Sequence, residues 1–572
     1  MVNSPNNISV GFHIASANMQ ASHVPKTLIQ NRDAYTVSDT QQPIINNIHA
    51  FDANLLLISQ DDTRPLLCRI QRGIEKEGLR TNDQGHLSIT PHPAALGSAL
   101  TNTWLTTDFS ESLLEFITPV FESIDETLAY LNDIHALAYQ QLHDEIIWGA
   151  SMPCILPADN DIPLAQYGTS NIATMKTVYR NGLGLRYGRA MQTVAGIHYN
   201  FSLPEAFWRR TFEHAKCQGT TQHTHLQHYI DERYFDLIRN FRRNYWLLIY
   251  LFGAAPCVDP SFVQGRENTL DVLTNNDLYQ PMATSLRMGD LGYQSSAQQS
   301  LFVCYNTLEN YIETLSSALR TPYAEYETLG VKNNNEYQQL SSSLLQIENE
   351  FYSAIRPKRV AQSGETPLKA LKERGIEYIE VRCLDINPFL ATGIDAETIQ
   401  FLDAFLLHCL LDDSPQCDQE EFHLISQNQA RIVHHGRDPN IPIFCGKNEV
   451  PMRDCANKII DRIEKISHQL DTAHQTKAYT ESISVQRKKV ADSALTPAAR
   501  MLATMQEKHE SHIEFCLRMS QAHAEKHKSH RVEPQQQQNL LTIAEQSIAS
   551  QQEIEQQDSI DFESFLAHYF EQ

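Results

Sequence analysis

Strand-like and helix-like patterns occupy separate parts of this 572-residue sequence and do not alternate as βαβ units. Side chains alternate with a period of two in residues 196–203 (GIHYNFSL) and 375–384 (GIEYIEVRCL). Residues 66–89 form two further stretches around an Asn-Asp-Gln-Gly turn, where Gly85 can adopt the positive φ of a hairpin loop. Helical periodicity dominates elsewhere. This separation predicts an α+β fold with a largely antiparallel sheet.

The charge balance restricts the partners. A formal net charge of −23 disfavours binding to nucleic acid and to anionic membranes. An acidic protein that handles anionic substrates must gather positive charge locally, from arginines or bound cations. No secretory signal is visible at the start, and the longest apolar run, residues 246–255 (WLLIYLFGAA), is half the length that spans a bilayer, so it predicts a buried helix. Eleven cysteines without a C-x-x-C pair predict a reduced, cytoplasmic protein.

Composition divides the chain into four parts. Residues 1–48 are rich in Asn, Ser and Gln without a clear period, which predicts a mobile extension. Residues 49–525 would form the catalytic domain, and residues 526–558, rich in Gln and Glu, are typical of a linker. In residues 559–572, Phe562, Phe565, Leu566, Tyr569 and Phe570 share a helical face, so we expect this last helix to dock on the body of the protein.

Carboxylates on two predicted strands are the first candidates for chemistry. Glu75 and Glu77 point to one face of a strand, about 6–7 Å apart. A divalent cation between them would remove their repulsion, and oxygen ligands suit Mg²⁺ or Mn²⁺. In residues 376–384, Glu380 and Arg382 share a face and could serve as a metal ligand and a charge clamp beside phosphate. Each short motif is also typical of an exposed surface strand.

A second acidic group lies in residues 106–119 (TTDFSESLLEFITP). Asp108 and Glu115 are seven residues apart, so two helical turns would place them on one side; the plain alternative makes Asp108 a helix N-cap and the glutamates an exposed face. In residues 196–202, His198 lies on a His/Asn/Ser face that suggests a strand lining a wet cavity. Its role as a ligand or as a hydrogen-bonded bystander stays open.

Arginines and tyrosines suit the binding of amino acids. Tyr179 and Arg180 occur in a run rich in Tyr and Gly, and Arg287 and Tyr293 lie in residues 283–293 (ATSLRMGDLGY). Arginine binds carboxylates in a bidentate manner, and tyrosine can wall a small pocket. No dinucleotide fingerprint or P-loop is present. Two histidine groups, 223–228 and 523–530, match no metal motif and are interpreted as chance clusters, the second on a solvated helix face.

Taken together, the ordered segments resemble one family. QRGIEKEGLR, ALGSALTNTWLTTDFSESLLEFITPV, SMPC, LAQYGTSN, MQTVAGIHYNFSLP, YLFGAAP, ATSLRMGDLGY, LQIENEFYSAIRPKR and GIEYIEVRCLDINPF are similar to segments of the proteobacterial glutamate–cysteine ligases. The likeness runs in order from about residue 49 to about residue 405, is weaker to about 519, and returns in the terminal helix. The N-terminal extension and the Gln-rich insertion depart from the family pattern without interrupting a motif.

The resemblance implies a funnel-like antiparallel sheet surrounded by helices and related to glutamine synthetase. It also implies ATP-dependent joining of the glutamate γ-carboxylate to the cysteine amine through a γ-glutamyl phosphate, the first step of glutathione synthesis, with Mg²⁺ or Mn²⁺. By position, the metal ligands would be Glu75, Glu77, Asp108, Glu115, His198 and Glu380; the catalytic set Glu75, Glu77, Glu380 and Arg382; and the substrate pocket Phe109, Tyr179, Arg180, Arg287, Tyr293 and Tyr352. Another amine acceptor, a two-metal hydrolase and a silent scaffold remain alternatives, and a monomer is left open.

Overall fold

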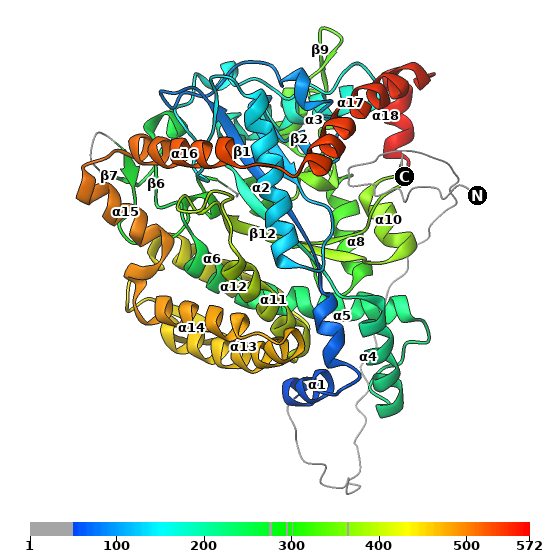
Figure 1. Cartoon of the computed structure of the whole chain (residues 1–572). Helices are drawn as coiled ribbons and strands as arrows, with labels where there is room; N and C mark the ends of the chain where they lie inside the picture. Colours follow the sequence, from blue (N-terminus) through cyan, green and yellow to red (C-terminus); the bar gives the residue numbers. More distant parts are fainter. Residues whose placement is uncertain (1–49, 274–276, 293–295, 300, 363–364) are drawn as a thin grey trace, which may run out of the picture.

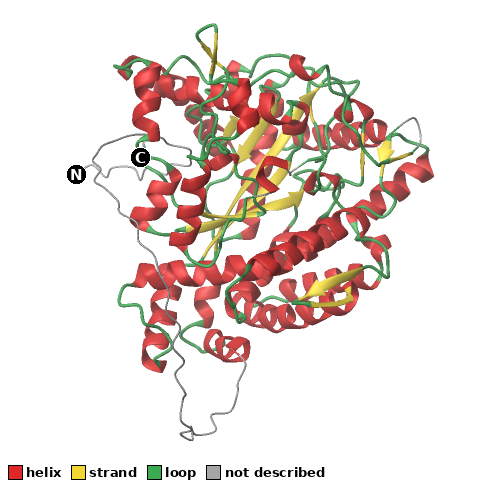
Figure 2. Ribbon diagram, turned by 180° about the vertical axis from the view of Figure 1, so that it is seen from behind, coloured by secondary structure: helices red, strands yellow, loops and turns green. Residues whose placement is uncertain are grey.

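The computed structural model describes residues 50–273, 277–292, 296–299, 301–362 and 365–572. At its centre is a seven-stranded sheet in the order β11-β12-β5-β1-β3-β2, with β4 paired to β1, and every pairing in it is antiparallel. The strands are β1 (Gln71–Thr81), β2 (Leu105–Thr107), β3 (Leu113–Ile117), β4 (Ile146–Ile147), β5 (Gly196–Ser202), β11 (Ile355–Lys358) and β12 (Tyr378–Asp385). Helices surround this sheet (Figure 2). The predicted α+β class is therefore confirmed.

Helices make up about half of the described residues outside the sheet. The helices are α1 (Ala50–Ile58), α2 (Ile124–Gln141), α3 (Asn171–Tyr187), α4 (Glu205–Gln218), α5 (Leu226–Asn244), α6 (Trp246–Phe252), α7 (Ser296–Gln299), α8 (Leu308–Ala318), α9 (Ala324–Leu329), α10 (Pro367–Arg374), α11 (Ala396–Leu411), α12 (Gln419–His435), α13 (Met452–His474), α14 (Ala478–Ala491), α15 (Pro497–Lys508), α16 (His512–Ser529), α17 (Pro534–Gln557) and α18 (Phe562–Phe570). Short strands form three small sheets: β6 (Cys257–Val258) with β7 (Asp271–Val272) and β8 (Leu278–Tyr279), β9 (Lys332–Asn333) with β10 (Glu336–Tyr337), and β13 (Pro442–Cys445) with β14 (Asn448–Pro451).

Helices cover one face of the central sheet and leave the other for polar side chains. Helix α2 packs against β1 and β3, α5 against β11, and α6 against β12. The sheet residues Ile74, Tyr199, Ile379 and Val381 are fully buried on this covered face. Helix α6 is buried along its whole length, as its uninterrupted apolar sequence predicts. No helix within the described ranges is long and apolar enough to cross a membrane.

The segment from Asp108 to Glu115 is a hairpin, so the helical prediction was wrong. Strand β2 pairs with β3, and Thr106 lies opposite Glu115. The turn is closed by side chains: Ser110 Oγ accepts a hydrogen bond from the backbone N–H of Ser112 (3.2 Å) and donates one to Pro163 O (2.7 Å). Ser and Asp favour such turns over helix interiors because their side chains compete for backbone groups.

The Gln- and Glu-rich segment is also ordered differently from the prediction. Instead of a linker, residues 534–557 form helix α17, which packs against α2 and against the short 3-10 helix Ala94–Leu96 (Figure 1). Its few buried residues, Leu540, Ala544 and Ser547, follow helical spacing. The indole of Trp104 donates a hydrogen bond to Leu540 O (3.1 Å). The division of the chain into domains stays a prediction, and residues 1–48 lie outside the described ranges.

The close packing of α17 predicts a strong effect at Gly97. This residue has φ +84°, and a Cβ atom there would lie 2.5 Å from Ser547 Oγ and 2.7 Å from Ala544 O. Gly97→Ala should therefore lower the free energy of unfolding by at least about 2 kcal/mol, through backbone strain and displacement of α17. Urea denaturation would measure it. Gly219→Ala is the control, because Gly219 has φ +67° with nothing within 4 Å of the added atom; it should cost about 1 kcal/mol. Equal losses would contradict the tight contact.

The terminal helix docks as expected, with one exception. Leu566 and Tyr569 are buried, and Phe562 and Phe565 pack around them. Phe570, assigned to the same apolar face, is 42% exposed. The prediction of a solvated histidine face in α16 was wrong: His523 and His527 are buried, and their Nε2 atoms lie 2.8 Å from Pro388 O and 3.1 Å from Ala391 O.

Candidate functional site

Strand register brings the predicted acids to the open face of the sheet. In β1, Glu75 lies opposite His198 of β5, and Glu77 lies opposite Glu115 of β3. Glu380 of β12 lies opposite Asn200 of β5, two residues beyond His198. Residues directly opposite in an antiparallel pair share a face, as do alternate residues of one strand. Four strands therefore direct these six polar side chains to one side.

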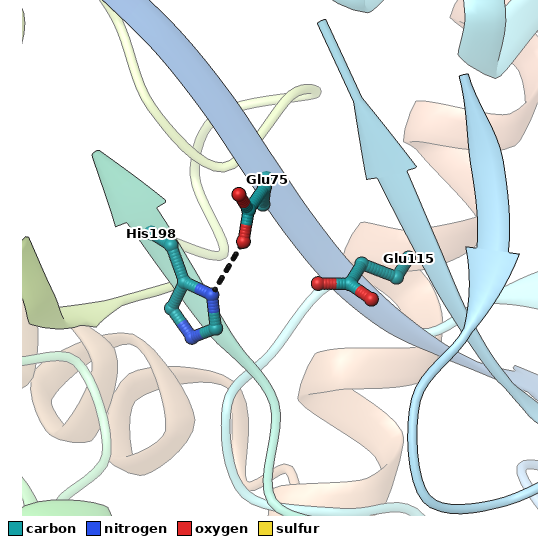
Figure 3. Close-up of side chains that lie close together, drawn as sticks. All are labelled: Glu75, Glu115 and His198. Carbon is teal, nitrogen blue, oxygen red and sulfur yellow. Dashed lines mark hydrogen bonds and ion pairs between the residues drawn. The ribbon is translucent and has the colours of Figure 1, made fainter. Parts of the chain in front are cut away.

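Glu75, Glu115 and His198 converge most closely. One ligand atom from each lies within 4.8 Å of the other two, and the three side chains point toward one another from β1, β3 and β5 (Figure 3). His198 Nδ1 lies 3.1 Å from Glu75 Oε2, and His198 Nε2 lies 3.6 Å from Glu77 Oε1. Asn200 Nδ2 donates to Glu75 Oε1 at 3.0 Å. Three of the six predicted ligands lie outside this close group: Glu77 contacts it through His198 Nε2, Glu380 is held by Lys358 and Arg382, and Asp108, 45% exposed, lies 3.9 Å from Arg180 Nη2.

The acids differ in their electrostatic surroundings. Burial, together with the nearby charges of Glu75 and Asp108, raises the pKa of Glu115 well above its usual value. Burial and Asp108 also raise the pKa of Glu77, although His198 opposes this. At Glu380 burial acts in the same direction, but Lys358 and Arg382 outweigh it and hold the pKa well below its usual value. Glu115 is thus the acid most in need of an added positive charge.

Glu380 lies among basic side chains, of which the sequence indicated only Arg382. Lys358 Nζ lies 3.0 Å from its Oε1, and Arg382 Nη1 donates to its Oε2 at 3.0 Å. Lys358 and Arg356 alternate on β11, and Arg356 lies opposite Glu380. Their period-two pattern is present in the sequence, but the intervening Pro357 argues against a strand, so the pattern alone does not indicate this group.

Two cavities meet at the acid cluster. The larger, about 960 Å³, extends from Glu75 and Glu115 past Arg356 and Lys358 to apolar side chains that include Trp208 and Ile230. The smaller, about 150 Å³, also includes Glu75 and Glu115, and it contains Glu77, Asp108, His198 and Arg382. Glu380 lines neither cavity, but it joins Lys358 of the larger to Arg382 of the smaller. The acid cluster therefore forms the passage between them.

The predicted substrate residues gather around the smaller cavity. Phe109, Tyr179, Arg180, Arg287 and Tyr352 all line it, whereas Tyr293 lies outside the described residues. Helix α3 contributes Tyr179 and Arg180 from consecutive positions, and its N-cap, Ser170, accepts a hydrogen bond from Ala173 N. Arg287 is 1% exposed, and its Nη1 lies 3.5 Å from Asp385 Oδ1. Tyr352 Oη accepts a hydrogen bond from Gln192 Nε2 at 2.8 Å.

The donor set fits a divalent cation. Carboxylate oxygens from Glu75 and Glu115 and a ring nitrogen from His198 approach one another closely enough to share one ion. Oxygen-rich sets of this kind suit Mg²⁺ or Mn²⁺, and a single imidazole is compatible with Mn²⁺ in particular. Burial and the neighbouring carboxylates raise the pKa of Glu115, and a bound cation would oppose this rise.

Comparisons with known proteins identify the family of this chain. The profile of the glutamate–cysteine ligase family matches residues 55–432. The chain is 48% identical over 528 residues to a glutamate–cysteine ligase of Saccharophagus degradans (92% of this chain, 98% of that one) and 48% identical over 505 residues to one of Pseudomonas putida (88% and 95%). A crystal structure of the Francisella tularensis glutamate–cysteine ligase in complex with AMP superimposes with a TM-score of 0.82 at 36% identity, covering 88% of this chain and 97% of that one. This chain belongs to the glutamate–cysteine ligase family.

Proposed function

We propose that the chain joins L-glutamate to L-cysteine in the passage between its two cavities, with ATP entering from the larger one. Family membership makes it an ATP-dependent glutamate–cysteine ligase of glutathione synthesis. This placement of the reaction rests on one observation: the side chains of Glu75 and Glu115 line both cavities. A phosphoryl group from one side and a carboxylate from the other can therefore meet beside the same acids.

The larger cavity suits a nucleotide. Its volume, about 960 Å³, accommodates a nucleoside triphosphate, and its apolar end around Trp208, Leu226 and Ile230 can receive a base. Near the acid cluster, Arg356, Lys358 and Arg359 line the wall and supply the positive charge that the acidic chain lacks overall. The Francisella relative is described in complex with AMP, which supports a nucleotide site in this fold.

Glu75, Glu77 and Glu115 with His198 would hold Mg²⁺, or Mn²⁺ in its place, and Asp108 and Glu380 would extend the set. A bound divalent ion supplies positive charge that neutralises phosphate oxygens during phosphoryl transfer. Arg382, held by Glu380, is directed at the same place and stabilises negative charge on the transferred phosphoryl group. The glutamate γ-carboxylate attacks the γ-phosphorus, ADP leaves, and the cysteine amine then displaces phosphate from the γ-glutamyl phosphate.

The smaller cavity would bind the amino acids. Arg180 and Arg287 are the candidates for their α-carboxylates, because guanidinium groups bind carboxylates in bidentate geometry. Phe109, Tyr179 and Tyr352 wall the cavity with aromatic rings. These rings keep water from the acyl phosphate, which would otherwise hydrolyse.

The test is ADP release measured with glutamate alone, with glutamate and cysteine, and with other amines, each with and without Mg²⁺. We expect turnover that requires both amino acids and the metal, together with formation of γ-glutamylcysteine. Faster turnover with another amine would identify a different acceptor, and hydrolytic turnover without ATP would identify a hydrolase. No turnover by folded protein would contradict the proposal. A cytoplasmic location and a monomeric state stay predictions, which fractionation and light scattering would check.

Lys358 lines the larger cavity and not the smaller one, so its substitution should affect the KM for ATP selectively. Lys358→Ala removes a positive charge from the larger cavity and from Glu380. We expect the KM for ATP to rise about tenfold, since one charge-assisted contact of about 1.5 kcal/mol is lost, while the KM for glutamate stays within about twofold. Steady-state kinetics at varied ATP measure this. Lys372→Ala, on α10 and lining neither cavity, is the control. A rise confined to the KM for glutamate would reverse the assignment.

A further inference from the structure

The last helix of the chain reaches the smaller cavity. Helix α18 packs against α3, far from it in sequence, and both lie on the same side of the molecule (Figure 1). Between them is an apolar cluster separate from the main core, formed by Met175, Leu340, Ile347, Leu566 and Tyr569. Three members of this cluster, Met175, Ile347 and Tyr569, also line the smaller cavity. The terminal helix therefore covers an apolar surface and also contributes a side chain to the wall of the smaller cavity.

Polar contacts fix α18 at both ends. Before the helix, Asn171 N donates to Asp558 Oδ2 and Asn171 Nδ2 donates to Ile560 O at 2.9 Å. After it, Thr366 N donates to Gln572 Oε1 at 3.3 Å. Asn171 is the first residue of α3, which carries Tyr179 and Arg180, and Thr366 is the N-cap of α10. The helix thus bridges two elements that border the cavity.

Tyr569 is placed to touch a ligand rather than to fill the core alone. Its side chain is 4% exposed, and it lines the cavity beside Tyr179 and Ile347. Burial, with Glu348 and Tyr179 nearby, raises the pKa of its phenol well above the usual value, so the ring stays neutral at any pH at which an enzyme works. Phe570, the next residue, is 42% exposed and lines neither cavity.

The chemistry of this wall discriminates between the two amino acids. Glutamate presents carboxylates at both ends and needs cations, which Arg180 and Arg287 offer elsewhere in the cavity. The cysteine side chain is small, uncharged and polarisable, and thiol sulfur packs favourably against aromatic rings and methionine. A wall made of Met175, Ile347 and the Tyr569 ring matches the cysteine side chain.

We infer that Tyr569 is a specificity-determining residue, whose ring, with Met175 and Ile347, forms the wall that receives the cysteine side chain. This inference rests on the proposed function and adds to it that the site is incomplete without α18. It assigns a role in substrate choice to the far C-terminal part of the chain, 61 residues beyond the end of α15 at Lys508.

The experiment compares Tyr569→Ala with the full-length enzyme and with Phe570→Ala, a truncation of the neighbouring exposed ring. For Tyr569→Ala we expect the KM for cysteine to rise about tenfold, the scale of losing most of one buried aromatic contact, while the KM values for glutamate and ATP change by less than about twofold. Phe570→Ala should leave all three unchanged, and Tyr569→Phe should behave as the unsubstituted enzyme because it keeps the ring.

If Tyr569→Ala does not fold, Tyr569→Leu keeps the apolar packing and removes the ring, and the same rise for cysteine is expected. Unchanged KM for cysteine, or an equal rise for all substrates, would overturn the inference. A loss in Tyr569→Phe as large as in Tyr569→Ala would overturn it as well, because the hydroxyl would then be the active group. Absence of turnover in the unsubstituted enzyme would instead refute the proposed function, so the two failures are distinguishable.

Discussion

Glu75→Gln is expected to lower kcat by at least about a hundredfold, the scale of losing one preorganised electrostatic group, while the fold stays intact. Glu75 is connected to several parts of the site: it contacts His198 and Asn200, belongs to the close group with Glu115, and lines both cavities. Glutamine keeps the size and the hydrogen bonds of one oxygen, but it lacks the charge that holds a divalent ion.

Turnover of the variant should be measured as ADP release across a Mg²⁺ titration. We expect the apparent Mg²⁺ affinity to fall along with kcat, because the loss acts through the metal. Glu449→Gln is the matched control, since Glu449 is also on a strand, is 48% exposed and lines neither cavity. Near-normal kcat with unchanged Mg²⁺ dependence in Glu75→Gln would show that the metal lies elsewhere.

The sequence predicted the individual strands of the site better than their assembly. Alternation identified β5 and β12 and the shared faces of Glu75 with Glu77 and of Glu380 with Arg382. What brings Glu75 to His198, and Glu77 to Glu115, is the register between strands far apart in the chain. Period-two patterns within one strand carry no information on its partner, so the family resemblance, not the pattern, joined these residues.

Two errors have local physical causes. Asp108 and Glu115 fit helical spacing, yet strong turn formers separate two short strands there, and pairing with β1 stabilises the hairpin. In α17, the high Gln and Glu content concealed a narrow stripe at Leu540, Ala544 and Ser547, which is enough because Gly97 allows close approach. The roles of Tyr293 and of residues 1–48 stay predictions, since both lie outside the described residues.

The buried ion pair between Arg72 and Asp403 should contribute strongly to the free energy of unfolding. Arg72 of β1 donates to Asp403 of α11 through Nε at 3.0 Å and Nη2 at 2.6 Å, and both side chains are 0% exposed. Tyr199 Oη donates to Asp403 Oδ1 at 2.6 Å, and Tyr479 Oη lies 3.3 Å from its Oδ2. One carboxylate thus binds β1, β5 and α14 to α11.

Asp403→Ala should lower the free energy of unfolding by about 3–5 kcal/mol, because it leaves the Arg72 charge buried without its counter-ion and the Tyr199 phenol without its acceptor. Urea denaturation measures the loss. Asp461→Ala is the control, since Asp461 pairs with Arg487 at 2.8 Å but is 64% exposed; it should cost less than about 1 kcal/mol. Arg72 and Tyr199 are on the strands that hold Glu75 and His198 in register, so Asp403→Ala should also weaken Mg²⁺-dependent turnover below its unfolding midpoint. An equal loss of unfolding free energy in both variants would show that the buried Arg72–Asp403 pair stabilises the fold no more than an exposed pair does.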